Sequence, residues 1–227
     1  MSLIGTLNLK GLPGPRPLSS YLRQDADLLQ HRITYVHGSR FGVLVDRDGT
    51  LNVDRGYLRD PAELKLLPGS GEALVLLNSA DIPVAIITNQ SGIGRGVITM
   101  TEFEAVNQAL WDDLQVYGAR YDGLYYCPHN PTVEPSCPCR KPQMGLLLQA
   151  AVDLKLDLAR SYVVGDKRSD IEAGMAVGSR TVLVLTGFGK LAHQEMESNG
   201  IHPDYIANDL LEACLWILLH SQTARNN

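Results

Sequence analysis

The chain has 227 residues, of which 44% are hydrophobic and 20% are charged, a composition typical of folded globular domains and unlike that of disordered chains. Its formal net charge of -5 provides no basic surface for nucleic acid or an anionic membrane, although a small phosphorylated substrate needs only a few local cations. No early segment has the pattern of a secretory signal, and the longest late apolar run, residues 210–219, is about half as long as a membrane span. We therefore expect a cytoplasmic protein that binds neither nucleic acid nor membranes.

The first forty residues carry few structural signals. Glycines and prolines in residues 11–17 interrupt regular structure, and residues 21–31 offer at most one short helix. We expect residues 1–40 to be an amino-terminal extension of one domain that spans residues 41–227.

From residue 41 onward, strand-like and helix-like patterns alternate, which predicts a doubly wound, Rossmann-like α/β fold with a parallel sheet. The expected strands are residues 42–46, 83–88, 122–127, 161–165, 180–185 and, more weakly, 204–207. The expected helices are residues 69–79, 101–117, 143–155, 169–177, 190–198 and 209–220. Thr101 and Glu104 have the spacing of a capping box at the start of the second helix.

The first expected strand ends at two carboxylates, Asp46 and Asp48, which Gly49 and Thr50 follow. Beyond the last paired residue of a strand the backbone turns, so both acids can approach one bound group. Two such charges repel each other unless a cation relieves them, which implies a hard divalent ion such as Mg²⁺. An isolated Asp-x-Asp is more often a loop with two solvated aspartates, so the other clusters must decide.

Similar polar clusters follow three other expected strands, and ligands bind at this edge of such sheets. Thr88 ends a strand where its hydroxyl and the next N–H groups can hold anionic oxygens. Arg140 and Lys141 can neutralise a phosphoryl group, although in isolation a solvated basic pair is the better interpretation of them. Asp166 repeats the strand-then-carboxylate pattern and can be a further Mg²⁺ ligand, with Asp170 as an outer-shell partner.

Three of the four cysteines and one histidine lie within a short loop, residues 127–139: Cys127, His129, Cys137 and Cys139. Three thiolates and an imidazole form a complete tetrahedral set for a structural Zn²⁺. The ion would fold a proline-rich loop and fix the two basic residues that follow it. The alternative is a set of buried or free cysteines beside a surface histidine.

In this order on alternating strands, the motifs resemble those of the haloacid dehalogenase (HAD) superfamily of phosphatases. The motifs that carry the resemblance, within residues 43–185, are Asp46-x-Asp48-Gly49-Thr50, Thr88, Lys141 and Gly165-Asp166-x-x-x-Asp170. The resemblance implies no large cap domain and a phosphoryl transfer in which Asp46 forms an aspartyl-phosphate and Asp48 is the general acid and base. It also implies that Asp46, Asp166 and the Asp48 carbonyl hold Mg²⁺, and that Thr88 and Lys141 hold the phosphate.

The cysteine loop resembles that of a subgroup that includes histidinol-phosphate phosphatases and phosphatases of heptose bisphosphates. The motifs of residues 52–57, 88–93, 125–129 and 164–167 resemble the heptose members, which implies removal of the 7-phosphate of a heptose 1,7-bisphosphate in lipopolysaccharide or heptose nucleotide precursor synthesis. Histidinol phosphate is the alternative substrate, and a non-catalytic zinc-loop binding module is the alternative of another class. We expect a monomer, with Arg140 at the second phosphate. The substrate contacts that the resemblance implies are Asp54, Arg55, Gly56, Tyr57, Asn89, Gln90, Ser91, Arg140 and Lys167.

Overall fold

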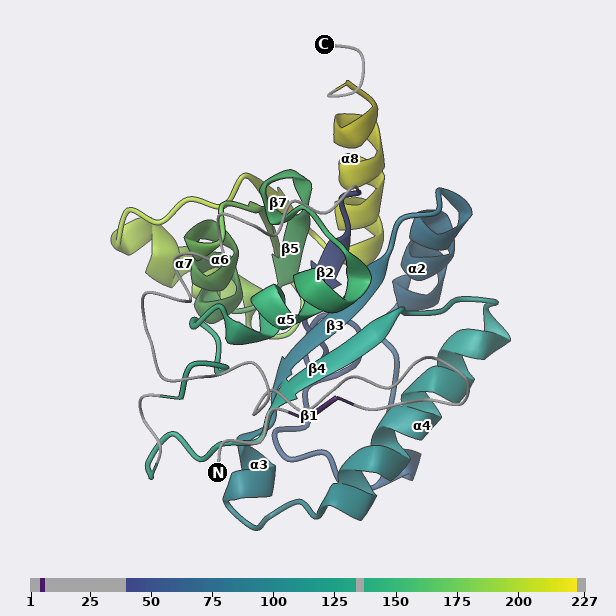
Figure 1. Cartoon of the computed structure of the whole chain (residues 1–227), viewed down its shortest axis with the longest axis vertical. Helices are drawn as coiled ribbons and strands as arrows, with labels where there is room; N and C mark the ends of the chain where they lie inside the picture. Colours follow the sequence, from purple (N-terminus) through teal and green to yellow (C-terminus); the bar gives the residue numbers. More distant parts are fainter. Residues whose placement is uncertain (1–4, 7–39, 134–136, 224–227) are drawn as a thin grey trace.

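A seven-stranded sheet organises the described residues, 5–6, 40–133 and 137–223, of the computed structural model (Figure 1). Its strand order is β1-β4-β3-β2-β5-β6-β7, in which β2 to β7 run parallel and β1 pairs antiparallel with β4. The strands are β1 (Gly5–Thr6), β2 (Val43–Val45), β3 (Val84–Asn89), β4 (Gly123–Cys127), β5 (Tyr162–Gly165), β6 (Arg180–Val184) and β7 (Tyr205–Ala207).

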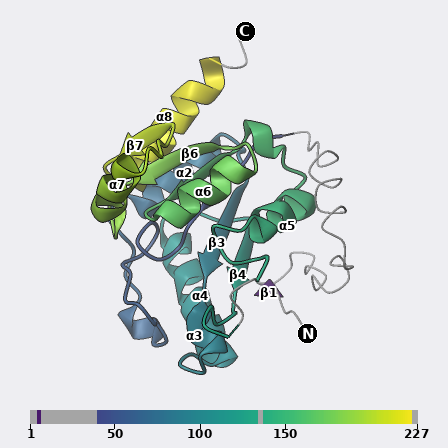
Figure 2. The ribbon, with the colours of Figure 1, turned by 90° about the vertical axis from the view of Figure 1, so that its left-hand side faces the viewer.

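Helices cover both faces of the sheet, as a right-angle view shows (Figure 2). The helices are α2 (Ser70–Ser79), α3 (Ser91–Gly94), α4 (Met100–Val116), α5 (Gly145–Leu154), α6 (Arg168–Ala176), α7 (Gly189–Ser198) and α8 (Leu210–Thr223), with short 3-10 turns at Pro61–Glu63 and Leu158–Arg160. The α2, α4 and α8 helices share one hydrophobic core with the sheet, whereas α5 and α6 pack on the opposite face, with α7 beside α6. The predicted doubly wound α/β fold is confirmed.

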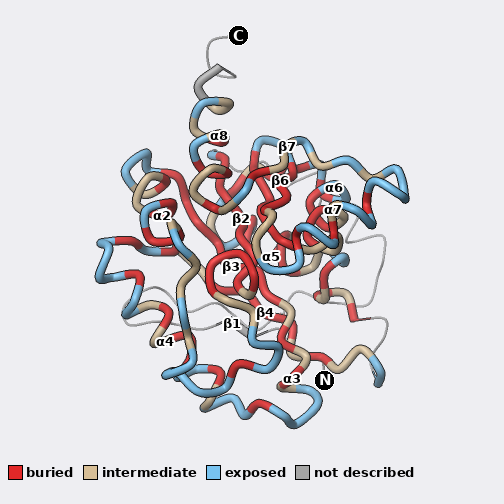
Figure 3. Tube along the Cα trace, turned by 180° about the vertical axis from the view of Figure 1, so that it is seen from behind, coloured by how far each residue is buried: buried red, intermediate tan, exposed pale blue. Residues whose placement is uncertain are grey.

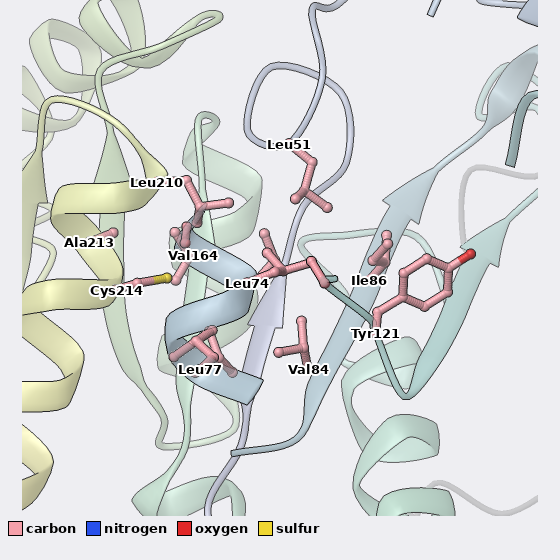
Figure 4. Packing of buried hydrophobic residues seen from close by; sticks show 14 of the residues in the cluster. Leu51, Leu74, Leu77, Val84, Ile86, Tyr121, Val164, Leu210, Ala213 and Cys214 are labelled. Carbon is pink, nitrogen blue, oxygen red and sulfur yellow. The ribbon is translucent and has the colours of Figure 1, made fainter. Parts of the chain in front are cut away.

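The central strands are buried on both faces (Figure 3). Because side chains alternate along a strand, Val43 and Val45 pack with α2 and α8, while Leu44 points to α5 and α6. Figure 4 shows Leu74 and Leu77 of α2 packed near Val84 of β3 in the first of these cores. Burial on both faces explains why these strands read as continuous apolar runs.

The six predicted strands and six predicted helices are present, with ends that differ by up to three residues. The predicted extension, residues 1–40, and its possible helix at residues 21–31 lie mostly outside the described residues. Within that segment, the structure describes β1, which the sequence did not predict, and Arg40, which bridges to Leu156. Among the described residues, no helix combines the length and apolar character needed to cross a membrane.

The capping box of α4 lies two residues earlier than predicted. Thr99 is the N-cap: its hydroxyl accepts a hydrogen bond from the Glu102 N–H at 3.2 Å, and the Glu102 carboxylate accepts one from the Thr99 N–H at 2.8 Å. Thr101 and Glu104 have the same spacing but lie inside the helix, so the predicted box is wrong. Two overlapping Thr-x-x-Glu patterns made the spacing ambiguous.

We expect Thr99→Ala to lower the free energy of unfolding by about 1 kcal/mol, because it leaves the first turn of α4 without its side-chain acceptor. Thr101→Ala is the matched control and should have little effect, since Ala is a good residue within a helix. Urea unfolding of both variants measures the difference. Equal losses in the two variants would contradict the Thr99 box.

Candidate active site and metal centres

Strand register brings Asp46 to the centre of the carboxyl edge of the sheet. Val45, the last residue of β2, pairs with Ile86 on β3 and with Val164 on β5. Asp46 therefore emerges between the ends of two neighbouring strands, and its N–H donates to the Val164 carbonyl at 2.9 Å. A buried strand thus delivers this carboxylate to the place where parallel sheets bind ligands.

A buried lysine connects the acids at this edge. The Lys141 ammonium donates to Asp46 Oδ1 and to the Ile87 carbonyl, each at 2.6 Å, and lies 2.6 Å from Asp170 Oδ1. Burial alone would lower the pKa of Lys141, but Asp170 and Asp46 outweigh it and raise that pKa. Burial raises the pKa of Asp46 to about 6, against the opposing effect of Lys141. Lys141 is therefore a fixed cation beside Asp46.

Asn89, at the end of β3, fixes the backbone of Lys141. Its amide donates to the Lys141 carbonyl and its side-chain oxygen accepts from the Lys141 N–H, both at 3.1 Å. This two-point contact joins β3 to the chain that leaves the cysteine loop. Asn89, predicted as a substrate contact, thus also positions Lys141.

The carboxylate of Asp48 points toward Arg47. The Arg47 guanidinium donates to both Asp48 oxygens, with its shortest contact at 2.9 Å, and amides of Asn52 and Gln90 donate to the same carboxylate at 3.0 and 2.8 Å. The Gln90 amide also donates to the Thr88 hydroxyl at 2.9 Å. Burial alone would raise the pKa of Asp48, but Arg47, with Asn52 and Gln90, holds it below its usual range. Arg47, the residue between the two acids, thus offsets the negative charge of the Asp48 carboxylate.

Three buried carboxylates form a cluster that can hold a metal ion. One oxygen from each of Asp46, Asp166 and Asp170 lies within 4.8 Å of the others. Asp166 Oδ2 accepts from the Phe188 N–H at 2.8 Å, whereas the buried Asp166 Oδ1 has no hydrogen-bond partner among the described residues. Burial, reinforced by Asp46, raises the pKa of Asp166 to about 8. An orphaned carboxylate oxygen among like charges fits a hard divalent cation.

The metal cluster differs in one member from the predicted ligand set. Asp170, predicted as an outer-shell partner, belongs to the cluster, and the Asp48 side chain does not. The backbone carbonyl of Asp48, the predicted ligand atom, accepts from the Lys167 ammonium at 3.4 Å. Lys167 also pairs with Asp54 at 2.9 Å, which brings the loop after β2 to the site.

A polar pocket opens over these groups. It is lined by Asp46, Asp48, Asp54, Gly56, Thr88, Asn89, Lys141, Lys167, Ser169 and Asp170. The other predicted substrate contacts do not line it: Arg55, Tyr57, Gln90, Ser91 and Arg140. The Tyr57 side chain is 45% exposed, and Arg140 has a buried Nη1 with no hydrogen-bond partner among the described residues. The structure thus brings the predicted catalytic set together and leaves several predicted substrate contacts around it.

The cysteine loop forms a second candidate metal centre. Its four side chains, Cys127, His129, Cys137 and Cys139, are buried and place their ligand atoms within 4.8 Å of one another. The Nδ1 atom of His129 lies 2.8 Å from the Cys137 sulfur and 3.1 Å from the Cys139 sulfur. Three sulfurs and one nitrogen around one point match the donor set of a closed zinc site.

Four residues of this region were missed by the sequence analysis: Arg47, Asn52, Asn107 and Ser169. A signal existed for two of them. Arg47 is a charge at the end of a buried strand, and Asn107 is a polar residue on the apolar stripe of α4, between Phe103 and Leu110. Buried polar residues need hydrogen-bond partners, so each of these two residues indicates a hydrogen-bond network outside the motifs.

Known proteins resemble the chain over most of its length. A family profile described as HAD-hydrolase-like matches residues 138–213. The chain is 39% identical over 176 residues to D-glycero-beta-D-manno-heptose-1,7-bisphosphate 7-phosphatase from Haemophilus ducreyi, which covers 75% of this chain and 94% of that protein. It is 41% identical over 151 residues to the Escherichia coli K12 protein of the same name, which covers 64% and 79%.

A solved structure supports the same relationship. The crystal structure of D,D-heptose 1,7-bisphosphate phosphatase from B. bronchiseptica, complexed with magnesium and phosphate, matches with a TM-score of 0.73 and 31% identity over 79% of this chain and 99% of that one. The chain belongs to the HAD superfamily of hydrolases. The predictions of the superfamily and of a phosphoric monoester hydrolase are confirmed.

Gly49 allows the close approach of Asp166, which gives a test of the site's packing. Gly49 has φ of 95°, and a Cβ atom there would collide with the Asp166 carboxylate. Gly178 also has a positive φ, of 73°, but open space around it, so Gly178→Ala introduces backbone strain without a collision. We expect a loss of about 1–2 kcal/mol for Gly178→Ala and a larger loss for Gly49→Ala in urea unfolding. Equal losses would show that the contact with Asp166 is not tight.

Proposed function

We propose that the chain is a magnesium-dependent phosphatase that removes the 7-phosphate of D-glycero-D-manno-heptose 1,7-bisphosphate. The observation that carries the proposal is a single pocket in which the Asp46 carboxylate, 2.6 Å from the Lys141 ammonium, lies with Asp48 and Thr88. The sugar substrate is supported by relatives of that name, one of which matches over 94% of its length.

Magnesium would be held by the carboxylates of Asp46 and Asp166 and by the Asp48 carbonyl. The Asp170 carboxylate, which belongs to the same cluster, would be a further ligand or would contact the ligands. The buried Asp166 Oδ1, which has no hydrogen-bond partner in the described part of the chain, supports this assignment. When bound, the ion would supply positive charge that offsets the repulsion between the Asp46 carboxylate and a phosphate dianion.

The chain's own residues divide the reaction into two steps. The Asp46 carboxylate attacks phosphorus while the bond from phosphorus to the sugar oxygen breaks, and Asp48 gives its proton to that oxygen. A water molecule then attacks the phosphorus of the aspartyl-phosphate while the bond from phosphorus to the Asp46 oxygen breaks, and Asp48 accepts the proton from that water. Phosphate and the free Asp46 carboxylate are the products. Lys141 neutralises charge on the transferred group, and the Thr88 hydroxyl donates to one of its oxygens.

The substrate would lie between the loop of residues 54–57 and the basic residues at the pocket mouth. Lys167 and Asp54 line the pocket as a pair, and Gly56 lies beside them. Arg140 would contact the second phosphate, which a monophosphate lacks. All of these groups come from one chain, so we propose that the enzyme acts as a monomer.

The second metal would be a structural zinc in the cysteine loop. The three buried sulfurs and His129 Nδ1 satisfy four-coordinate zinc and leave no position for substrate. Its effect on the reaction would be indirect: the loop ends at Cys139, two residues before Lys141. Holding the loop would hold the cation of the active site.

A phosphate-release assay tests the function. The substrates are both anomers of heptose 1,7-bisphosphate, histidinol phosphate and p-nitrophenyl phosphate, each with Mg²⁺ and with a chelator. We expect magnesium-dependent preference for one heptose anomer, and a loss of at least about 1,000-fold in Asp46→Asn, since the nucleophile is removed.

Arg140→Ala refines this assay because it should weaken turnover of the bisphosphate more than that of the aryl phosphate. Equal turnover of all substrates would keep the phosphatase chemistry and refute the heptose assignment. No turnover would favour a binding module, and full activity in Asp46→Asn would refute the proposed nucleophile.

The zinc site has its own test. We expect metal analysis of the purified chain to find about one zinc per chain, and Cys137→Ser to lower zinc content, melting temperature and phosphatase activity together. Cys214→Ser is the control for zinc content, which it should leave unchanged, since Cys214 is buried in the core away from the loop. A fully active chain without zinc would contradict the proposal.

A further inference from the structure

Arg47 is a buried charged side chain that connects the site to α4. It lies between the two acids of the first motif, and only 1% of its side chain is exposed. Its guanidinium donates from Nε and Nη2 to Asp48, so that both carboxylate oxygens are contacted from one side. A fork-shaped donor on both oxygens fixes the plane of the carboxylate as well as its position.

Asn107 anchors the other end of the guanidinium. The Asn107 side-chain oxygen accepts from Arg47 Nη1 at 2.9 Å, and its amide donates to the Phe103 carbonyl at 2.7 Å within α4. The Arg47 guanidinium carbon also lies 5.6 Å from the centroid of the Phe103 ring. A helix far from Asp48 in the sequence therefore determines where the guanidinium sits.

Fold stability alone does not explain a buried guanidinium at this position. Transferring an arginine from water into the protein interior is costly, and well-packed apolar residues often replace buried ion pairs without loss of stability. The position directly before Asp48 instead places the charge where it orients a group of the proposed reaction. An apolar side chain at this position could not orient that group.

We propose that Arg47 is a positioning residue for the acid and base Asp48, and that Asn107 holds Arg47 in place. This inference rests on the proposed phosphatase function. Without Arg47, the side-chain donors that remain to the carboxylate among the described residues are Asn52 and Gln90, and it can rotate. The transfer of the Asp48 proton to the leaving oxygen then loses its alignment, whereas the Asp46 carboxylate keeps its contact with Lys141.

The test compares substrates that differ in their need for an acid. A sugar alkoxide leaves poorly unless it is protonated, whereas p-nitrophenolate leaves without a proton. Because kcat/KM covers the steps up to departure of the leaving group, we expect Arg47→Gln to lower it about 100-fold for the sugar phosphate and less than about 10-fold for p-nitrophenyl phosphate. Arg47→Lys should recover only part of the loss, because it keeps the charge and loses the fork.

A double-mutant cycle identifies the partner. In the Asp48→Asn background, Arg47→Gln should cause little further loss, since its effect passes through Asp48. Asn107→Leu, which touches neither Asp48 nor the pocket, should show the same dependence on leaving group to a smaller degree. Arg168→Gln, which removes a guanidinium paired with Glu172 and Glu195 on the surface of α6, should show none.

The outcomes separate the two proposals. An active wild-type chain with equal losses on both substrates in Arg47→Gln, or additive losses with Asp48→Asn, would overturn the role of Arg47 and leave the phosphatase function intact. A wild-type chain that turns over none of the substrates would overturn both. If Arg47→Gln does not fold, as its unfolding curve would show, Asn107→Leu decides: a leaving-group dependence supports the positioning role of Arg47, and its absence refutes that role.

Discussion

Repulsion between carboxylates is the constraint that shapes this site. Parallel strands end at the same edge, so the acids that follow them are brought close together whether or not this is favourable. The five acids are Asp46, Asp48, Asp54, Asp166 and Asp170, and the cations that contact them are Arg47, Lys141 and Lys167. With every group ionised, two negative charges remain, which is the charge that one divalent ion would offset. The three cations thus offset most of the negative charge of the acids, and the charge that remains suits one divalent ion.

Different structural elements hold the three cations in place. Lys141 is held by Asn89 on β3 and lies two residues after Cys139, so its backbone is connected to both the sheet and the cysteine loop. Arg47 is held from α4 through Asn107. Lys167 is 38% exposed and is held by Asp54 on a loop. The two buried cations therefore contact residues of a strand and a helix, whereas the partly exposed Lys167 contacts a loop residue.

The sequence predicted the fold and the central site because both depend on local patterns. Strands buried on both faces are continuous apolar runs, and an acid directly after such a run must appear at the carboxyl edge. The side-chain direction of Asp48 was not predictable in this way, since it depends on Arg47 and on Asn107, sixty residues away. The spacing of the motifs predicts which residues lie at the same edge of the sheet. Which of their side chains form ion pairs or hydrogen bonds depends on the packing of segments far apart in the sequence.

The two-residue β1 strand has a consequence for the exposed edge of the sheet. Without it, β4 would be an edge strand, and the main-chain groups of Tyr125 and Tyr126 that pair with Gly5 and Thr6 would be open. Open strand edges recruit strands from other molecules, which is a common route to aggregation. The β1 strand therefore protects the edge of the sheet against pairing with other molecules. A chain that begins at residue 40 would keep every group of the site but would lose this protection against self-association.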